Sequence, residues 1–329
     1  MIHRSGGFDA LRLVAASLVI FGHSYPLTGH VATFGLFTNG FHEIGVKIFF
    51  VISGYLITRS WQSDPHLGRF WLKRALRIMP GLITVCLLTV MVAGPLISSL
   101  PVFDYFSNRG TAFYFWNVAL YPIFALPGVF TDNIYPDAVN GSLATLPIEV
   151  AMYCGVPILI GHYRSSARFL IPGAALGLIA ASIYFVHIAP PTSSPIVWGS
   201  SLIAALDVAY YFYAGATMAV LRLDRFCNLW TALAIFCASN WLFHTDAISA
   251  EIALAVALPY LSISVGKAKY TFLKRLDGHD YSYGLYLYGF PVQQMVVHFI
   301  GAQSALFNTA VSLPITLIFA VLSWREIEP

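Results

Sequence analysis

The chain has 329 residues, of which 58% are hydrophobic and only 10% are charged, and its formal net charge is +3. A soluble domain could not bury this much apolar surface, so the composition predicts an all-α polytopic membrane protein. The small net charge gives no reason to expect a nucleic-acid partner. None of the four cysteines is in C-x-x-C spacing, so we expect neither a disulfide nor a metal site.

The first apolar run, 8–26, contains three ionisable residues: Asp9, Arg12 and His23. At about 100° and 1.5 Å per residue, Arg12 and His23 share one helix face and lie about 16 Å apart along the axis. Because ionisable groups are costly inside a membrane, this face must point into a protein interior or a wet cavity. The run lacks a small-residue cleavage site, so we expect it to stay as the first membrane helix.

Basic residues lie near the start of the second apolar run, 43–61, and in the segment that follows it. We expect the Lys47 side chain to snorkel to the outer interface. Arg74 and Arg77 are three residues apart, so they share a face if their segment is helical. They serve either to fix the topology or to bind a phosphate-bearing cytoplasmic ligand, because a guanidinium matches the geometry of phosphate. Pro80 fits the start of the third membrane helix.

Ten apolar runs are long enough to span a membrane: 8–26, 43–61, 80–100, 142–161, 168–188, 198–221, 229–244, 247–266, 281–301 and 305–324. Lys and Arg gather in every second connection, so we predict about ten transmembrane helices with both termini in the cytoplasm. A crossing by 111–126 would put Arg164 and Arg168 outside, so we expect that segment to be re-entrant or interfacial. No linker or repeat divides the chain, and we expect a single membrane domain over 1–329 with no appended soluble domain.

Polar side chains inside later runs are candidates for a site. Glu149 has no charge near it in sequence, so it either is functional or neutralises a buried Arg or His. Tyr and Gln side chains in 281–301 can bind sugar hydroxyls, although interfacial anchoring or interhelical hydrogen bonds account for them equally well. Ser53, followed by a glycine, equally suits close helix packing. We take four residues as candidates for binding the substrate: Ser53, Tyr153, Tyr286 and Gln293.

Two further ionisable residues rank lower at this stage. Asp207 is a second possible intramembrane carboxylate, which we place below Glu149. His42 lies at the outer end of a run and is less promising than His23. No histidine has metal-site spacing such as H-E-x-x-H.

Five segments of the chain stand out in order. They are Arg12 with His23, GVKIFFVISGYLI at 45–57, Phe70 with Arg74, Arg77 and Ile78, NGSLATLPIE at 140–149, and SYGLYLY with a following Phe-Pro at 282–291. Together they resemble the motifs of the acyltransferase-3 family of membrane O-acyltransferases, which includes bacterial O-antigen and exopolysaccharide acetylases. The resemblance runs from Phe8 to Glu328. Ala144 stands where the family usually has Trp, and Gly289 where many members carry His.

The resemblance implies a ten-helix fold, an acyl-CoA donor on the cytoplasmic side and a carbohydrate or glycolipid acceptor. By family usage acetyl-CoA is the default donor, and succinyl and other acyl groups stay open. The resemblance implies His23 as the essential catalytic residue, and Glu149 matches the carboxylate of the fourth motif. The donor-binding residues, with one lysine added for its nearby charge, are Arg12, Arg74, Arg77 and Lys73. We therefore expect an O-acyltransferase surrounded by lipid in the bacterial inner membrane. The sequence carries no information about the oligomeric state.

We expect His23, Glu149 and Asp9 to be catalytic, and their roles stay open. His23 is either a general base on the acceptor hydroxyl or a covalent acyl carrier. Asp9 either pairs with Arg12, three residues on, or orients His23. Glu149 either fixes the tautomer of His23 or assists proton transfer from the sugar. The alternative function is a transporter of a lipid, sugar or acyl carrier with these residues as a relay, and it would release no free CoA.

Overall fold

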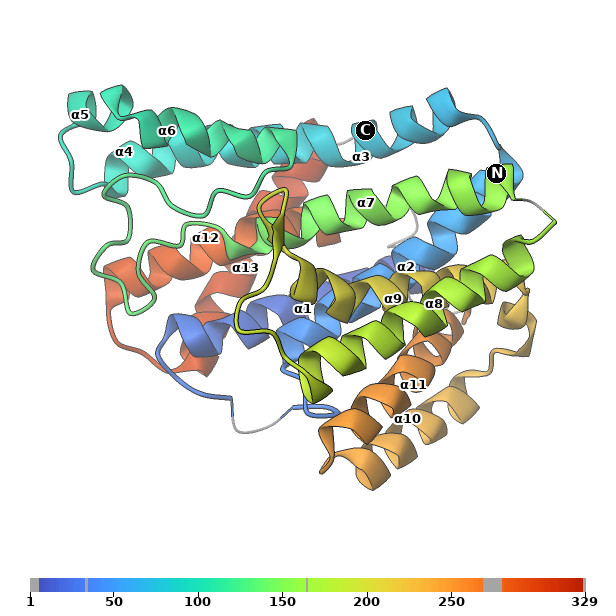
Figure 1. Ribbon diagram of the computed structural model, residues 1–329. Helices are drawn as coiled ribbons and strands as arrows, with labels where there is room; N and C mark the ends of the chain where they lie inside the picture. The colour runs from blue at the N-terminus through green and yellow to red at the C-terminus, as the bar shows by residue number, and fades with distance from the viewer. Residues whose placement is uncertain (1–5, 33–34, 164, 269–279, 328–329) are drawn as a thin grey trace.

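The computed structural model describes residues 6–32, 35–163, 165–268 and 280–327, and nearly all of their secondary structure is helical (Figure 1). The α-helices are α1 (Gly6–Leu27), α2 (Phe41–Ser63), α3 (Leu67–Leu88), α4 (Gly94–Ile97), α5 (Val102–Ser107), α6 (Arg109–Phe113), α7 (Leu146–Val156), α8 (Ala167–Ile183), α9 (Leu202–Val220), α10 (Leu229–Phe243), α11 (Ala247–Lys267), α12 (Ser282–Ile300) and α13 (Ala305–Glu326). Shorter helical segments are η1 (Thr89–Ala93), η2 (Tyr114–Ala119), η3 (Gly141–Thr145), η4 (Pro157–His162), η5 (Tyr184–Ile188) and η6 (Leu223–Phe226). One hairpin pairs β1 (Ile196–Val197) with β2 (Ser200–Ser201).

Eight helical stretches in the described part of the chain are long and apolar enough to cross a membrane. They are Gly6–Leu27, Phe41–Ser63, Leu67–Ile97, Gly141–His162, Ala167–Ile188, Leu202–Val220, Ala247–Lys267 and Ala305–Glu326. The shorter α10 and the more polar α12 coincide with the remaining two predicted runs. The all-α polytopic class is therefore confirmed, while the side on which each terminus lies stays a prediction.

α3 begins at Leu67, well before the start that Pro80 suggested. The His66 side chain caps the helix, since it accepts a hydrogen bond from the Arg69 backbone nitrogen at 3.3 Å. The predicted boundary was wrong: Pro80 lies inside the helix, where neighbouring groups can satisfy the backbone that a proline frees. In consequence Arg74 sits on the first half of a membrane helix and not in a connection.

The segment 111–126 contains no helix long enough to span, and it folds back beside α3, against which η2 packs (Figure 1). Just before this segment, the Tyr105 hydroxyl on α5 donates a hydrogen bond to the Val90 carbonyl of η1 at 3.0 Å and so connects the two helices. The Asn117 amide closes the irregular part, because it donates to the Ile123 carbonyl and accepts from the Ile123 backbone nitrogen, both at 3.0 Å. The Asn117 side chain thus satisfies both backbone groups of Ile123, in the way that irregular backbone packed against protein can be tolerated in a membrane protein.

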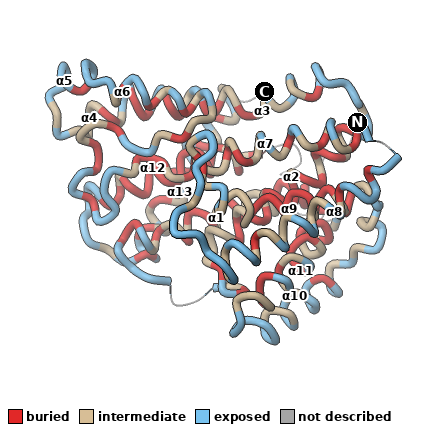
Figure 2. Tube along the Cα trace, viewed as in Figure 1, coloured by how far each residue is buried: buried red, intermediate tan, exposed pale blue. Residues whose placement is uncertain are grey.

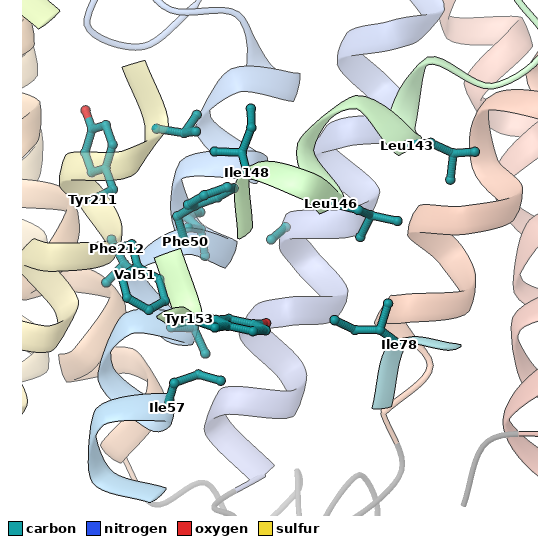
Figure 3. Packing of buried hydrophobic residues seen from close by; sticks show 14 of the residues in the cluster. Phe50, Val51, Ile57, Ile78, Leu143, Leu146, Ile148, Tyr153, Tyr211 and Phe212 are labelled. Carbon is teal, nitrogen blue, oxygen red and sulfur yellow. The ribbon is translucent and has the colours of Figure 1, made fainter. Parts of the chain in front are cut away.

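Buried residues are frequent on α1, α2, α9 and α12 (Figure 2). α1 packs against both α2 and α12, and α2 packs against α9. α2 and α9 approach closely at Gly54, where an added Cβ would lie 1.8 Å from the Phe212 carbonyl oxygen. The close helix packing expected at Ser53 and Gly54 is therefore present. Around it, Val51 packs beside the Phe212 ring, and Tyr153 points toward Ile78 of α3 (Figure 3).

Lys47 does not snorkel to an interface, contrary to the prediction. Its side chain is 1% exposed, and its ammonium lies 3.0 Å from an Asp207 carboxylate oxygen on α9. It also donates to the Asn39 side chain and lies over the Tyr211 ring. A long basic side chain stays inside when a charged partner is available there, and Asp207 provides that partner.

Candidate functional site

Two cavities lie one behind the other in the helix bundle. The first, of about 100 Å³, is called here the arginine cavity, and its polar lining residues include Arg12, Ser53, Arg74, Arg77, Glu149, Tyr153 and Tyr286. The second, of about 450 Å³, is called the histidine cavity, and its polar lining residues include His23, His42, Glu43, Ser142, Thr145, Ser200, Ser201, Asp207 and Tyr286. Arg12 and His23 lie in the first and last thirds of α1, so the arginine cavity lies toward the end predicted to be cytoplasmic.

Asp280 holds two of the arginines from different helices. Its carboxylate lies 3.1 Å from an Arg12 guanidinium nitrogen and 2.6 Å from one of Arg77, and it also accepts from the Ser282 backbone nitrogen. Burial alone would raise the pKa of the Asp280 carboxyl, but Arg77 and Arg12 overcome this effect and hold it below its usual range. The sequence reasoning missed Asp280. The signal for it was its place two residues before the SYGLYLY motif.

Asp9 lies beside Arg12, at 3.6 Å, and on the same helix. Its side chain is 2% exposed, so it adds a buried negative charge to the Arg12 side of the cavity. Asp9 lines neither cavity. Of the two roles left open, pairing with Arg12 therefore has a geometric basis.

Arg74 and Glu149 complete the polar wall of the arginine cavity. The Arg74 Nε atom is buried and has no hydrogen-bond partner among the described residues. One Glu149 oxygen accepts from the Ser53 hydroxyl at 2.6 Å and from the Tyr153 hydroxyl at 2.5 Å. Three predicted residues from α2 and α7 therefore form one connected group. Glu149 lines this cavity and not the one that contains His23.

Lys73 and Gln293 lie outside both cavities. The Lys73 ammonium lies 2.9 Å from Asp64, and its side chain is 47% exposed. Hydrogen bonds from Arg69 and Lys73 hold the pKa of Asp64 below its usual range. The Gln293 amide donates to the Ile20 carbonyl at 2.7 Å and to the Ser24 hydroxyl at 2.6 Å, so interhelical hydrogen bonding accounts for it.

His23 faces a second histidine. The ring centroids of His23 and His42 are 5.1 Å apart, and the Phe290 ring lies 5.3 Å from His23. The Nδ1 atom of His23 is buried with no hydrogen-bond partner in the described part of the chain. The approach depends on Gly22, where an added Cβ would lie 2.3 Å from the His42 backbone nitrogen. His42 ranked below His23 from sequence, because only the tertiary crossing of α1 and α2 brings the two rings together.

A thin wall separates the two cavities. Val46, Thr145 and Tyr286 line both of them, and the Thr145 and Tyr286 hydroxyls are 2.5 Å apart. The NGSLATLPIE segment brings Thr145 to this point, because the Asn140 amide donates to the Leu287 carbonyl of α12 at 2.9 Å. The arrangement allows one ligand to enter each cavity and to meet the other at Tyr286.

The part of the site that the structure describes offers no clear place for a metal ion. No three His, Cys, Asp or Glu side chains among the described residues converge in a way that could hold a metal ion. The three guanidinium groups of the arginine cavity instead fit an organic anion, because they bind phosphate and carboxylate through paired hydrogen bonds.

Comparison with known proteins agrees with this arrangement. The chain is 26% identical over 340 residues to an O-acetyl transferase of Shigella phage Sf6, covering 99% of this chain and 96% of that protein. It is 30% identical over 358 residues to nodulation protein 10 of Rhizobium leguminosarum bv. viciae, covering 99% and 94%. It is 23% identical over 361 residues to the peptidoglycan O-acetyltransferase OatA of Listeria monocytogenes, covering 97% of this chain and 54% of that protein. No solved structure matches the chain. The family model described as an acyltransferase domain matches residues 5–325, and the chain belongs to this acyltransferase-3 family.

Proposed function

We propose that this O-acyltransferase moves an acyl group, acetyl in the simplest case, from cytoplasmic acyl-CoA to a hydroxyl of an exported or cell-surface carbohydrate. The observation that carries the proposal is the pair of cavities that meet at Thr145 and Tyr286, one lined by arginines and the other by histidines. The names of the phage and Listeria relatives support acetyl as the group, and the Listeria name, a peptidoglycan O-acetyltransferase, supports a cell-envelope glycan as the acceptor. The location that follows is the bacterial cytoplasmic membrane.

The arginine cavity is the donor side in this proposal. CoA carries several phosphate charges that cannot enter hydrocarbon, so its nucleotide stays at the cytoplasmic face near Arg74 and Arg77. The cavity is narrow, at about 100 Å³, which suits the thin pantetheine arm better than a nucleotide. Arg12 and Glu149 then face the arm, and Glu149 belongs to the donor side because Ser53 and Tyr153 hold it there.

The histidine cavity is the acceptor side. His23 acts as the general base: an imidazole nitrogen takes the proton of the acceptor hydroxyl, whose oxygen bonds to the thioester carbonyl carbon. The carbon–sulfur bond then breaks, and the CoA sulfur leaves with a proton returned from the imidazolium. An acyl-histidine at His23 is the second route to the same products. In both routes the thioester has to reach the wall at Tyr286.

Thioester turnover tests the proposal. Purified protein in lipid nanodiscs receives acetyl-CoA and mixed cell-envelope glycans, and free CoA and glycan-bound acetyl are both measured. Because a general base contributes about 10²- to 10⁴-fold, His23→Ala should lower the rate by at least about 10²-fold. His30→Ala is the matched control, because His30 is exposed, contacts Thr28 and lines neither cavity.

Two results would count against the proposal. A folded His23→Ala protein with full transfer would remove His23 from the mechanism. A folded wild-type protein that neither binds acetyl-CoA nor releases CoA would exclude acetyl-CoA as the donor. It would favour a transporter, since transport does not cleave a thioester.

A further inference from the structure

The acceptor side of the site has an electrostatic character of its own. We propose that the histidine cavity binds a neutral sugar unit and discriminates against anionic sugars, with Asp207 and Glu43 as the residues that determine this preference. The inference rests on the proposed function and names the class of acceptor that the cavity fits. Its basis is the chemistry of the two carboxylates, the cations available near them and the remaining lining.

Asp207 presents a fixed negative charge to the cavity. Its side chain is 30% exposed, and one of its oxygens lies 3.0 Å from the Lys47 ammonium. Lys47 is only 1% exposed and also binds Asn39, so it pairs with the Asp207 carboxylate from inside the protein and is not itself accessible to a ligand. The Asp207 carboxylate therefore offers its oxygens to the cavity as hydrogen-bond acceptors.

Glu43 is the second carboxylate, on the first turn of α2. One of its oxygens accepts from the Gly40 backbone nitrogen at 2.6 Å, which fixes the orientation of the group. Glu43 and Asp207 line the same cavity from two different helices. A ligand between them meets acceptors on two sides.

Sugar hydroxyls match this lining, since each can donate a proton to a carboxylate in a charge-assisted hydrogen bond. A uronate carboxylate or a sugar phosphate offers no proton and is repelled by like charge. Among the described residues that line the cavity, none is Lys or Arg. Lys47 lies behind Asp207 and pairs with that carboxylate, which leaves Glu43 as the acidic group that repels a ligand anion. The serine hydroxyls and the Phe124 and Tyr286 rings suit a neutral pyranose with polar edges and an apolar face.

Matched acceptor pairs test the inference. One pair is maltohexaose and maltohexaose oxidised to carboxylates at C6, and the other is cellohexaose and cellohexaose oxidised in the same way. Binding to wild-type protein in nanodiscs is measured by saturation-transfer difference NMR, and acetyl incorporation from acetyl-CoA by mass spectrometry. The neutral member of each pair should bind at least about tenfold more tightly, because like charges this close repel strongly at low dielectric.

Variants connect the preference to the two carboxylates. Glu43→Gln keeps an oxygen for the Gly40 nitrogen and removes the charge, so it should narrow the neutral-to-anionic ratio by at least about threefold. Asp104→Asn removes an exposed carboxylate outside the cavity and should leave the ratio unchanged. Asp207→Asn is the weaker test, because it also leaves Lys47 without its charged partner.

The possible outcomes distinguish the proposed acceptor preference from the proposed acyl transfer. Equal or tighter binding of the anionic sugars, or no binding of either class, would overturn the inference. An unchanged ratio of neutral-sugar to anionic-sugar binding in Glu43→Gln would show that Glu43 does not determine the preference. Neutral-sugar binding without acetyl incorporation would support the inference and count against the proposed acyl transfer alone.

Discussion

The arginine cavity and the histidine cavity share a wall but are built in opposite ways. In the first, guanidinium groups from α1 and α3 are held by a buried carboxylate, Asp280. In the second, Lys47 pairs with Asp207 but is not among the described lining residues, and imidazoles and carboxylates face the space. This difference is the basis of the two proposals, an anionic donor on one side and a neutral acceptor on the other. Changes on either side of the wall should therefore have separable effects.

The largest effect is expected from breaking the ion set of the arginine cavity. Asp280→Ala leaves Arg12 and Arg77 facing each other without their shared carboxylate, which costs about 3–5 kcal/mol for a fully buried pair. Because the two arginines are 17% and 29% exposed, we expect the lower end, about 3 kcal/mol, together with loss of acyl-CoA binding. Thermal unfolding in detergent and a donor-binding assay measure the two effects.

The matched control is Asp64→Ala, which removes an exposed carboxylate that binds Arg69 and Lys73 and should change stability little.

The pKa of the Asp280 carboxyl is held low, so the stability that this group contributes is present above the unfolded pKa of about 3.9. That stability is lost only as the pH falls through the lower folded pKa. Stability at pH 5 should therefore match that at pH 7 as far as this group is concerned. An Asp280→Ala protein with unaltered unfolding would show that the arginines do not need it.

Arg74 tests the donor side without breaking an ion pair. Its Nε has no hydrogen-bond partner among the described residues, so the group is available for a ligand anion. Arg74→Ala should weaken acyl-CoA binding by about 10- to 100-fold, the range for a hydrogen bond to a charged group, with little loss of stability. Arg109→Ala is the control, because Arg109 is exposed and lines neither cavity, and it should leave donor binding unchanged. Equal losses in the two variants would mean that net charge matters and the cavity does not.

His42 tests the acceptor side in the same way. We expect His42→Gln to lower transfer by about tenfold, less than the loss of a direct base, because His42 positions His23 or the acceptor and His23 is retained. Donor binding should stay at the wild-type value, since His42 lines only the histidine cavity. His30→Gln is the control. A parallel fall in donor binding would indicate a general disturbance of α1 and α2.

The sequence was sufficient for most of the helices but for only part of the site. Apolar runs of about 20 residues predict membrane helices because the bilayer sets their length, and the 3.6-residue period placed Arg12 and His23 on one face. The pairing of Arg12 with Asp280 joins residues 268 positions apart, and no local pattern carries that information. His42 beside His23 and Asp207 beside Lys47 were missed for the same reason. Tyr153, four residues after Glu149, was within reach of an i, i+4 argument.

The smallest expected effect concerns the wall between the cavities. Tyr286→Phe removes one hydroxyl and keeps the ring, so it should change transfer only a few-fold, in line with about 0.5–1.5 kcal/mol for a hydrogen bond. Tyr286→Ala removes the ring and joins the two cavities, which should raise acceptor-independent hydrolysis of acetyl-CoA because water then reaches the thioester. The ratio of hydrolysis to transfer measures this directly. If Tyr286→Phe raised that ratio as much as Tyr286→Ala, the hydrogen bond to Thr145 would be what keeps the donor and acceptor sides apart, and the ring would not.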